Sequence, residues 1–382
     1  MLNSSMLSDR VEEQIVRTGV QQVHYVRPVA YENAKGLVAA VYEQMRRDFQ
    51  LLAPITVHSP IPELLAAVWC ITRETLIAGR VPRLQKEVIA AAVSQGNQCT
   101  YCVDAHVLML QGGNEAKVAR AIAATNLDSI ADHTLRRLAE WGLSTRSAKE
   151  AAEQSSPFDQ ESAAEIIGTA LAFHYINRVV DVFLEKSPME LPWPLAWAKR
   201  PLGKLAAATF AKRLVGVAAH PGDSLPLLSD AQLPADLAWA QANPFVAGAY
   251  ARSAVVIESV GRKFIPGPVR ALVLDRVARW NGETMGPSRA WVEAEIAALD
   301  ERAKPAARLA LVVALAPFQL DQGLVSAFRV GFPSADELLA TVSWAAFTAA
   351  RRIGGCLRRT ELPTLHELTA HFKRHSIIRR LG

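Results

Sequence analysis

The fold is indicated most clearly by residues 84–113, which have the sequence LQKEVIAAAVSQGNQCTYCVDAHVLMLQGG. Apolar residues recur at helical spacing over 84–94 and again after Cys99, and Gly112–Gly113 match a helix stop. Pro82 precedes the first apolar stretch, where a helix start tolerates proline. We therefore expect two helices joined by a short loop, with both cysteines in the first turns of the second helix.

The same periodicity extends over most of the chain. It begins near Tyr31, and further helices are expected at 63–78, 115–124, 129–143 and 162–185. Alanine and leucine dominate, whereas runs of Val, Ile, Thr and Tyr with period two are scarce. The chain has 382 residues, 50% of them hydrophobic, which is enough for two domains of ordinary size. We predict an all-α fold.

The second half of the sequence looks like a decayed copy of the first. Residues 243–281 follow the pattern of 59–97, and Glu165 with its following helix is echoed by Glu337. Agreement at two separated places in the same order indicates an internal duplication. The positions that match the thiols fall around 284–287, where there is no cysteine.

These patterns predict a division of the chain into four parts. They are an N-terminal extension (1–30), a catalytic domain with the CxxC sequence (31–185), a Pro-rich linker (186–234) and a degenerate second domain that lacks the two CxxC cysteines (235–382). The all-α architecture is thus expected as a helical bundle of two pseudo-repeated domains.

Composition and charge argue against several classes of protein. The formal charge is +5, from 42 Lys and Arg against 37 Asp and Glu, and the basic clusters at 199–213 and 373–380 are local. A nucleic-acid-binding protein would usually concentrate its basic residues with stacking aromatic residues. Residues 1–19 lack the apolar core of a secretory signal, and no run of about 18 apolar residues exists. We expect a cytoplasmic protein with no membrane span and no nucleic-acid partner.

The four cysteines suggest redox chemistry rather than a disulfide scaffold. Cys99 and Cys102 form a CxxC motif, whereas Cys70 and Cys356 are isolated on apolar helical patterns and are interpreted as ordinary thiols. A helix N-terminus favours thiolate, which attacks peroxides and disulfides. The partner cysteine then converts a sulfenic acid to a disulfide before it is oxidised further. Zinc would need a second ligand pair, so no metal and no cofactor are predicted.

A histidine and a glutamate complete the predicted site. His106 lies four residues after Cys102 and seven after Cys99, which places it on the thiol face of the helix. An imidazole there can move protons near neutral pH. A carboxylate on the preceding helix would orient it, and Glu87 is the natural candidate.

The order Glu87, Cys99-x-x-Cys102-x-x-x-His106 resembles the alkylhydroperoxidase D-like branch of the carboxymuconolactone decarboxylase family. The helix at 164–184 is similar to the helix that closes the peroxidase-related members. The similarity covers residues 31–184, and the second half only as a degenerate repeat. It implies an all-α bundle that assembles into trimers or larger rings, so a homo-oligomer is expected.

The resemblance also implies roles for individual residues. Cys102 would react with the hydroperoxide, and Cys99, nearer the surface, would resolve the sulfenic acid and exchange with a thiol or lipoyl-type reductant protein. Glu87 and His106 would relay protons. Members of this branch carry a second histidine just before the second cysteine, where this chain has Tyr101. Three polar residues on the closing helix could line the pocket, but a packing role is favoured: His174, Asn177 and Arg178.

Three functions are compatible with the sequence. The first is a thiol-dependent peroxidase or disulfide reductase that forms a Cys99–Cys102 disulfide. The second is decarboxylation or isomerisation of a lactone by acid–base groups, which does not need two sulfurs. The third is a non-enzymatic redox sensor or scaffold. The degenerate repeat, in addition, is expected to replace a contact that is otherwise made between subunits.

Overall fold

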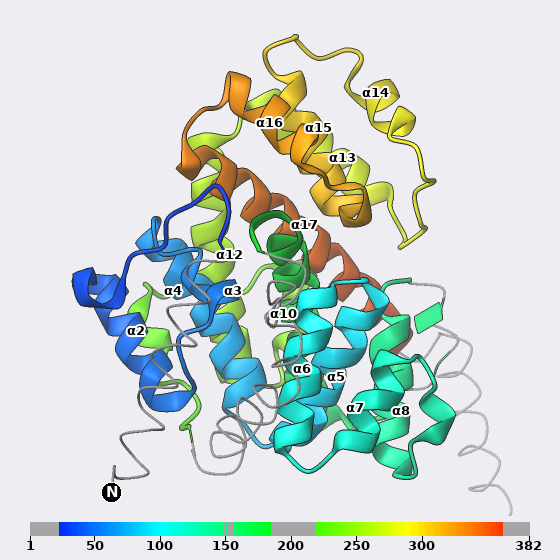
Figure 1. The fold of residues 1–382 in the computed structure, drawn as a ribbon. Helices are drawn as coiled ribbons and strands as arrows, with labels where there is room; N and C mark the ends of the chain where they lie inside the picture. The colour runs from blue at the N-terminus through cyan, green and yellow to red at the C-terminus, as the bar shows by residue number, and fades with distance from the viewer. Residues whose placement is uncertain (1–22, 148–149, 152–153, 155, 185–218, 362–382) are drawn as a thin grey trace, which may run out of the picture.

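The computed structural model describes residues 23–147, 150, 151, 154, 156–184 and 219–361, with side chains up to residue 357. Within these ranges the chain folds into helices and contains no β-sheet, and an isolated β-bridge joins Val23 to Leu184. The predicted all-α fold is confirmed (Figure 1). The N-terminal extension as far as residue 22, most of the predicted linker (185–218) and residues 362–382 lie outside the described residues.

The first half contains the helices that were expected, with small shifts in their bounds. A short π-helix, η2, directly continues α4. The elements of this half are α2 (Gly36–Asp48), α3 (Ala53–Thr56), α4 (Pro62–Thr72), η2 (Arg73–Ile77), α5 (Arg83–Gly96), α6 (Thr100–Gly112), α7 (Ala116–Ala123), α8 (His133–Ser144) and α10 (Gln160–Phe183). The described residues also form two short 3₁₀ helices in this half, η1 (Tyr31–Asn33) and η3 (Leu127–Ser129). A third, η5 (Leu225–Leu227), lies between the two halves in sequence.

The second half also consists of helices. A long helix lies near its start and another at its end, and shorter helices lie between them. Its elements are η6 (Ala235–Ala240), α12 (Pro244–Phe264), α13 (Gly267–Arg279), α14 (Ala290–Ile296), α15 (Lys304–Leu315), η7 (Pro317–Gln319), α16 (Gln322–Gly331) and α17 (Ala335–Glu361). The segment 284–287, which matches the thiol positions of the first half, is irregular chain before α14.

Capping residues in the sequence explain where several of these helices start. Asp159 precedes α10, and its carboxylate accepts the Ser162 N–H at 2.8 Å. Asp132 caps α8 in the same way through the Leu135 N–H at 2.9 Å. Such side chains satisfy backbone donors that have no partner within the helix.

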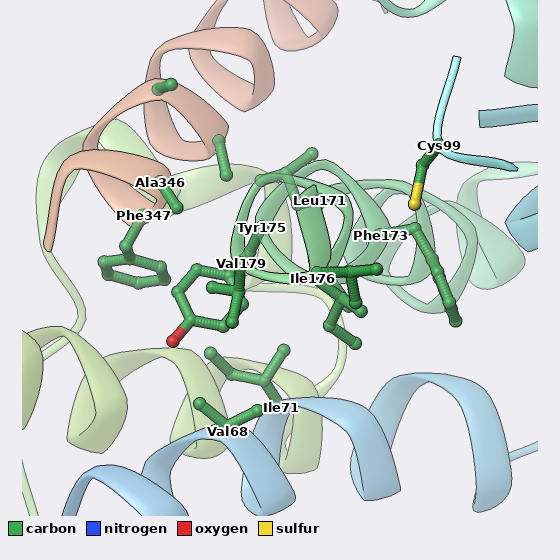
Figure 2. Packing of buried hydrophobic residues seen from close by; sticks show 14 of the residues in the cluster. Val68, Ile71, Cys99, Leu171, Phe173, Tyr175, Ile176, Val179, Ala346 and Phe347 are labelled. Carbon is green, nitrogen blue, oxygen red and sulfur yellow. The ribbon is translucent and has the colours of Figure 1, made fainter. Parts of the chain in front are cut away.

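The two halves pack through helices that the sequence pattern pairs with each other. α4 packs along α12, and α10 packs along α17, while α5 lies between α6, α8 and α10. Figure 2 shows this junction, where Val68 of α4, Tyr175 of α10 and Phe347 of α17 meet. The buried apolar side chains of both halves form one continuous cluster. Because apolar burial contributes about 25 cal/mol per Å², this shared core stabilises both halves together.

Glu165 and Glu337, which the predicted repeat pairs with each other, make different contacts. Gly79 has φ +110° in the turn after η2, and Glu165 of α10 accepts the N–H groups of Arg80 (2.9 Å) and Val81 (3.1 Å). The matching Gly261 lies inside the continuous helix α12, and Glu337 instead accepts the Ser334 N–H at the start of α17. Glu337 therefore does not make, among the described residues, the contact between helices that Glu165 makes.

Among the described residues, α10 is the helix whose length and mean hydropathy would suffice to cross a membrane. Its most apolar window is 94% buried inside the protein. A core helix of a folded domain has the same property, and α10 occupies the core here.

Candidate active site

The turn between α5 and α6 fixes the position of the first thiol. The Cys99 N–H donates to the Ser94 carbonyl (3.0 Å) and the Gln98 N–H to the Gln95 carbonyl (3.1 Å), with Gln98 at φ +60°. This is a Schellman ending, in which the left-handed residue is usually glycine. Cys99 is also the N-cap residue of α6, so the chain reverses at Gln98 and presents Cys99 at the start of the next helix.

The structure brings Glu87 and His106 together, as the sequence predicted. Glu87 of α5 and the Nδ1 atom of His106 on α6 are 2.7 Å apart, and Arg83 holds the other carboxylate oxygen at 2.6 Å. Glu87 is 1% exposed and His106 7%. The His106 ring also meets Phe173 of α10 edge-on, with 4.5 Å between the ring centroids. Arg83 and Phe173 therefore fix the glutamate and the imidazole, respectively.

The charge of Glu87 follows from these partners. Burial alone would raise its pKa, but the charge of Arg83 and the hydrogen bond from His106 outweigh burial and lower the pKa to about 2. Glu87 is therefore ionised at physiological pH and can only accept hydrogen bonds. The His106 Nδ1 must carry the proton, which leaves Nε2 as the nitrogen that can accept one.

The two thiols of the CxxC motif lie in contact at the start of α6. Cys99 and Cys102 are hydrogen-bonded to each other, and both are reduced. His106 follows Cys102 by one helical turn and shares its face of α6. The helical spacing thus places the imidazole one turn beyond the Cys102 sulfur.

Two expectations about Cys99 are wrong. It is not nearer the surface than Cys102, since the two residues are 1% and 3% exposed. Its position at a helix N-terminus also does not favour the thiolate. Burial, the Cys102 thiol and the negative charge of Asp181 together raise the pKa of Cys99 well above its ordinary value. Cys99 is therefore a protonated thiol at neutral pH.

Asp181, near the end of α10, is a site residue that sequence reasoning missed. Its carboxyl group is hydrogen-bonded to the Cys99 thiol. Loss of water around the carboxyl group raises the pKa of Asp181 to about 7, against the opposing effects of the Cys99 hydrogen bond and of the Arg178 charge. A carboxyl group that titrates near neutral pH beside a thiol can exchange a proton with it.

A buried hydrogen-bond network holds the loop before Cys99 against α10. The Asn97 amide donates to the Asn177 side-chain carbonyl (2.8 Å) and contacts His174 Nδ1 (3.1 Å), while Thr145 contacts His174 Nε2 (2.9 Å). Asn177 in turn donates to Ser94 (3.0 Å). Burial and nearby arginines lower the pKa of His174 well below its ordinary value, so it is neutral. His174 and Asn177 therefore position the thiol loop.

Arg178 connects the same helix to the second half of the chain. Its side chain donates to the Ala314 carbonyl at the end of α15 (3.1 Å) and to the His174 carbonyl (2.7 Å). Burial lowers its pKa to about 10, so it remains a cation beside Asp181.

The remaining cysteines lie away from this site. Cys70 on α4 donates to the Ser224 carbonyl at 3.2 Å, and burial raises its pKa to about 12. Cys356 is buried on α17. In the part of the chain that the structure describes, no group of three His, Cys, Asp or Glu side chains is arranged to hold a metal ion.

Comparison with known proteins identifies the family of this chain. The model of the carboxymuconolactone decarboxylase family matches residues 62–126, which include all four predicted site residues. The chain is also 37% identical over 333 residues to an alkyl hydroperoxide reductase of Mycobacterium tuberculosis (strain ATCC 25618 / H37Rv). That similarity covers 87% of this chain and 94% of the relative. The chain belongs to the carboxymuconolactone decarboxylase family. No solved structure matches it.

The long similarity places the chain with the alkylhydroperoxidase D-like proteins of the carboxymuconolactone decarboxylase family, as the motif indicated. Tyr101, which stands where that branch carries a histidine, is 7% exposed. Burial and the two neighbouring cysteines raise the pKa of its phenol, so Tyr101 stays protonated at neutral pH. The sequence analysis did not identify Arg83, although its position four residues before Glu87 on a helix indicates an ion pair. Asp181 had no such signal, because it lies 82 positions after Cys99 in the sequence.

Proposed function

We propose that the protein is a thiol-dependent peroxidase that reduces hydroperoxides through Cys102 and Cys99. The observation that carries the proposal is the pair of hydrogen-bonded thiols at the start of α6, one helical turn from an imidazole oriented by an ionised carboxylate. The relative from M. tuberculosis, named an alkyl hydroperoxide reductase, supports the same chemistry.

In the first step Cys102 is the nucleophile. His106 Nε2 takes the proton of the Cys102 thiol, and the thiolate attacks the outer oxygen of the hydroperoxide. The O–O bond breaks, Cys102 becomes a sulfenic acid, and the alkoxide leaves as an alcohol with the proton that His106 returns. Glu87 stays ionised throughout and holds the imidazole in the tautomer that this transfer needs.

In the second step Cys99 attacks the Cys102 sulfur, and water leaves as the Cys99–Cys102 disulfide forms. A dithiol reductant, of the lipoyl or protein type, then returns both cysteines to thiols by disulfide exchange and is itself oxidised to a disulfide. Cys102 is assigned the first attack because Cys99 is held as a thiol by burial and by Asp181.

Cys102→Ser tests this assignment. We expect loss of hydroperoxide turnover in the presence of a dithiol reductant, while the matched variant Cys356→Ser, which changes a buried cysteine on α17, retains it. Equal turnover by wild type and Cys102→Ser would refute the proposal. The variant also distinguishes the peroxidase from a lactone decarboxylase or isomerase, because the acid–base chemistry of such an enzyme would survive the loss of a sulfur.

The proposal extends to assembly. α4 with α12, and α10 with α17, pair equivalent helices of the two halves in the way that two identical subunits pair equivalent surfaces. We propose that the second half, which lacks the thiols, takes the place of a neighbouring subunit. The molecular mass in solution, measured by light scattering, determines whether the chain forms larger assemblies.

A further inference from the structure

We propose that Asp181 is the base that deprotonates Cys99 when Cys99 attacks the oxidised Cys102. This inference rests on the proposed peroxidase function and adds a residue to its second step. Two different groups then accept the thiol protons: His106 accepts the proton of Cys102, and Asp181 accepts the proton of Cys99.

The geometry that carries the inference is the register of α10. Asn177 of α10 bonds to Asn97 (2.8 Å), two residues before Cys99. Asp181 follows Asn177 by one helical turn on the same face of α10. The Cys99 side chain projects toward α10, on the side where Phe173 leaves the helix (Figure 2). The loop bonded to Asn177 therefore delivers the Cys99 thiol to the Asp181 carboxyl group, with which it is hydrogen-bonded.

Cys99 needs such a base because it is protonated at rest. It is 1% exposed, so water does not deprotonate it readily. The thiolate rather than the thiol attacks sulfur. Its proton must therefore move to a group within hydrogen-bonding distance as the S–S bond forms.

Among the described residues, the other polar groups around Cys99 cannot act as its base. The Tyr101 phenol is itself protonated at neutral pH because its pKa is raised. Both ring nitrogens of His174 are engaged by Asn97 and Thr145. The His106 imidazole is bonded to Glu87 and lies on the face of Cys102.

The charge environment of Asp181 suits the role. The groups that act on it are the Cys99 thiol from the start of α6 and the Arg178 cation on its own helix. Burial outweighs both and raises its pKa to about 7. A base is most effective when its pKa lies near the working pH, because it is then largely ionised yet binds a proton firmly.

The step balances as follows. The Cys99 sulfur forms a bond to the Cys102 sulfur, the S–O bond of the sulfenic acid breaks, and the Cys99 proton passes to Asp181. The proton that Asp181 took from Cys99 then passes to the departing hydroxide, which leaves as water, and Asp181 returns to its carboxylate. The Cys99 sulfur is oxidised and the Cys102 sulfur is reduced, so no other oxidant is needed.

Asp181→Asn in the full-length protein tests the inference. The reduced protein is mixed with one equivalent of hydrogen peroxide, and the sulfenic acid is trapped with dimedone at successive times for mass spectrometry. We expect the Cys102 sulfenic acid to form at the wild-type rate but to be converted to the disulfide about 10²-fold more slowly, the smaller end of the range for general-base catalysis. Asp128→Asn, a change at an exposed residue of η3, should leave both rates unchanged. Disulfide formation at the wild-type rate in Asp181→Asn would overturn the inference and leave the proposed function intact.

A second measurement does not depend on peroxide chemistry. In a Cys102→Ser background, the rate of Cys99 alkylation by iodoacetamide is followed against pH by mass spectrometry. Because the Asp181 charge raises the pKa of Cys99, Asp181→Asn should shift the alkylation midpoint to lower pH. An unchanged midpoint would show that the two groups do not interact and would overturn the inference. If Cys102 of the wild type is not oxidised by peroxide, the proposed function alone fails, and a lowered midpoint still supports the contact.

Discussion

Glu87→Gln tests the electrostatic arrangement on which the site depends. Glu87 is 1% exposed, bonded to Arg83 at 2.6 Å and to His106 at 2.7 Å, and its pKa is about 2 instead of 4.5. Glutamine has nearly the shape of a protonated glutamate. The variant therefore mimics, at every pH, the state that wild type reaches only in strong acid.

The expected magnitude follows from linkage between protonation and folding. A carboxyl group whose pKa is lower in the folded chain stabilises the fold above its unfolded pKa, and this stabilisation is lost as the pH falls toward the folded pKa. The gap between 4.5 and about 2 corresponds to about 3 kcal/mol, at about 1.4 kcal/mol per pH unit. The free energy of unfolding of wild type should therefore exceed that of Glu87→Gln by about 3 kcal/mol at pH 7. The difference should narrow below pH 4.5 and vanish near pH 2.

Urea unfolding at a series of pH values, followed by circular dichroism, measures this difference. Other titrating carboxylates such as Asp48 are common to both proteins and cancel from the comparison. Glu63→Gln, at an exposed position in the first turn of α4, is the matched control and should show no pH-dependent difference. A difference between wild type and Glu87→Gln that stays constant from pH 7 to pH 3 would refute the reasoning.

Three further predictions concern stability around the thiols. The pKa of Asp181 is raised from 3.8 to about 7, so its stabilising contribution is present below pH 3.8 and is lost as the pH rises through 7. Asp181→Asn should thus be more stable than wild type at pH 8, by up to about 4 kcal/mol, and equal to it near pH 4, in the same urea assay; lower stability at pH 8 would contradict this. Gln98→Gly relieves the left-handed conformation at φ +60° and should raise stability by about 0.5–1 kcal/mol, measured as a higher Tm; a lower Tm would contradict the strain argument. Asn97→Ala removes the partner of the His174 Nδ1 atom and of the Asn177 side-chain carbonyl, and should lower the free energy of unfolding by about 1–3 kcal/mol; an unchanged midpoint in urea would show that the network does not hold the loop.

Much of the fold could be predicted from the sequence because local signals agree. The apolar spacing of residues 84–94 and the glycines at 112 and 113 predicted helices with bounds close to those observed. The π-helix η2 and the left-handed Gln98 have no such signal, since both depend on packing around them. The repeat is a prediction from the sequence pattern, whereas the different contacts of Glu165 and Glu337 required the structure.

The site was predictable where its residues lie close in sequence. The spacing of Glu87, Cys99, Cys102 and His106 on two adjacent helices places them together, and the Glu87–His106 bond is present. The chemical state of Cys99 could not be predicted in this way. It is determined by burial and by Asp181, which comes from a helix whose register against the thiol loop is set by Asn97 and Asn177.

The central claim is that the two sulfurs of the CxxC motif react as a pair. Mass spectrometry of the reduced protein after one equivalent of hydroperoxide tests it most directly. We predict that the peptide containing Cys99 and Cys102 loses the mass of two hydrogens as the disulfide forms, while Cys70 and Cys356 remain thiols. Recovery of Cys99 and Cys102 as free thiols, with the hydroperoxide unconsumed, would contradict the account.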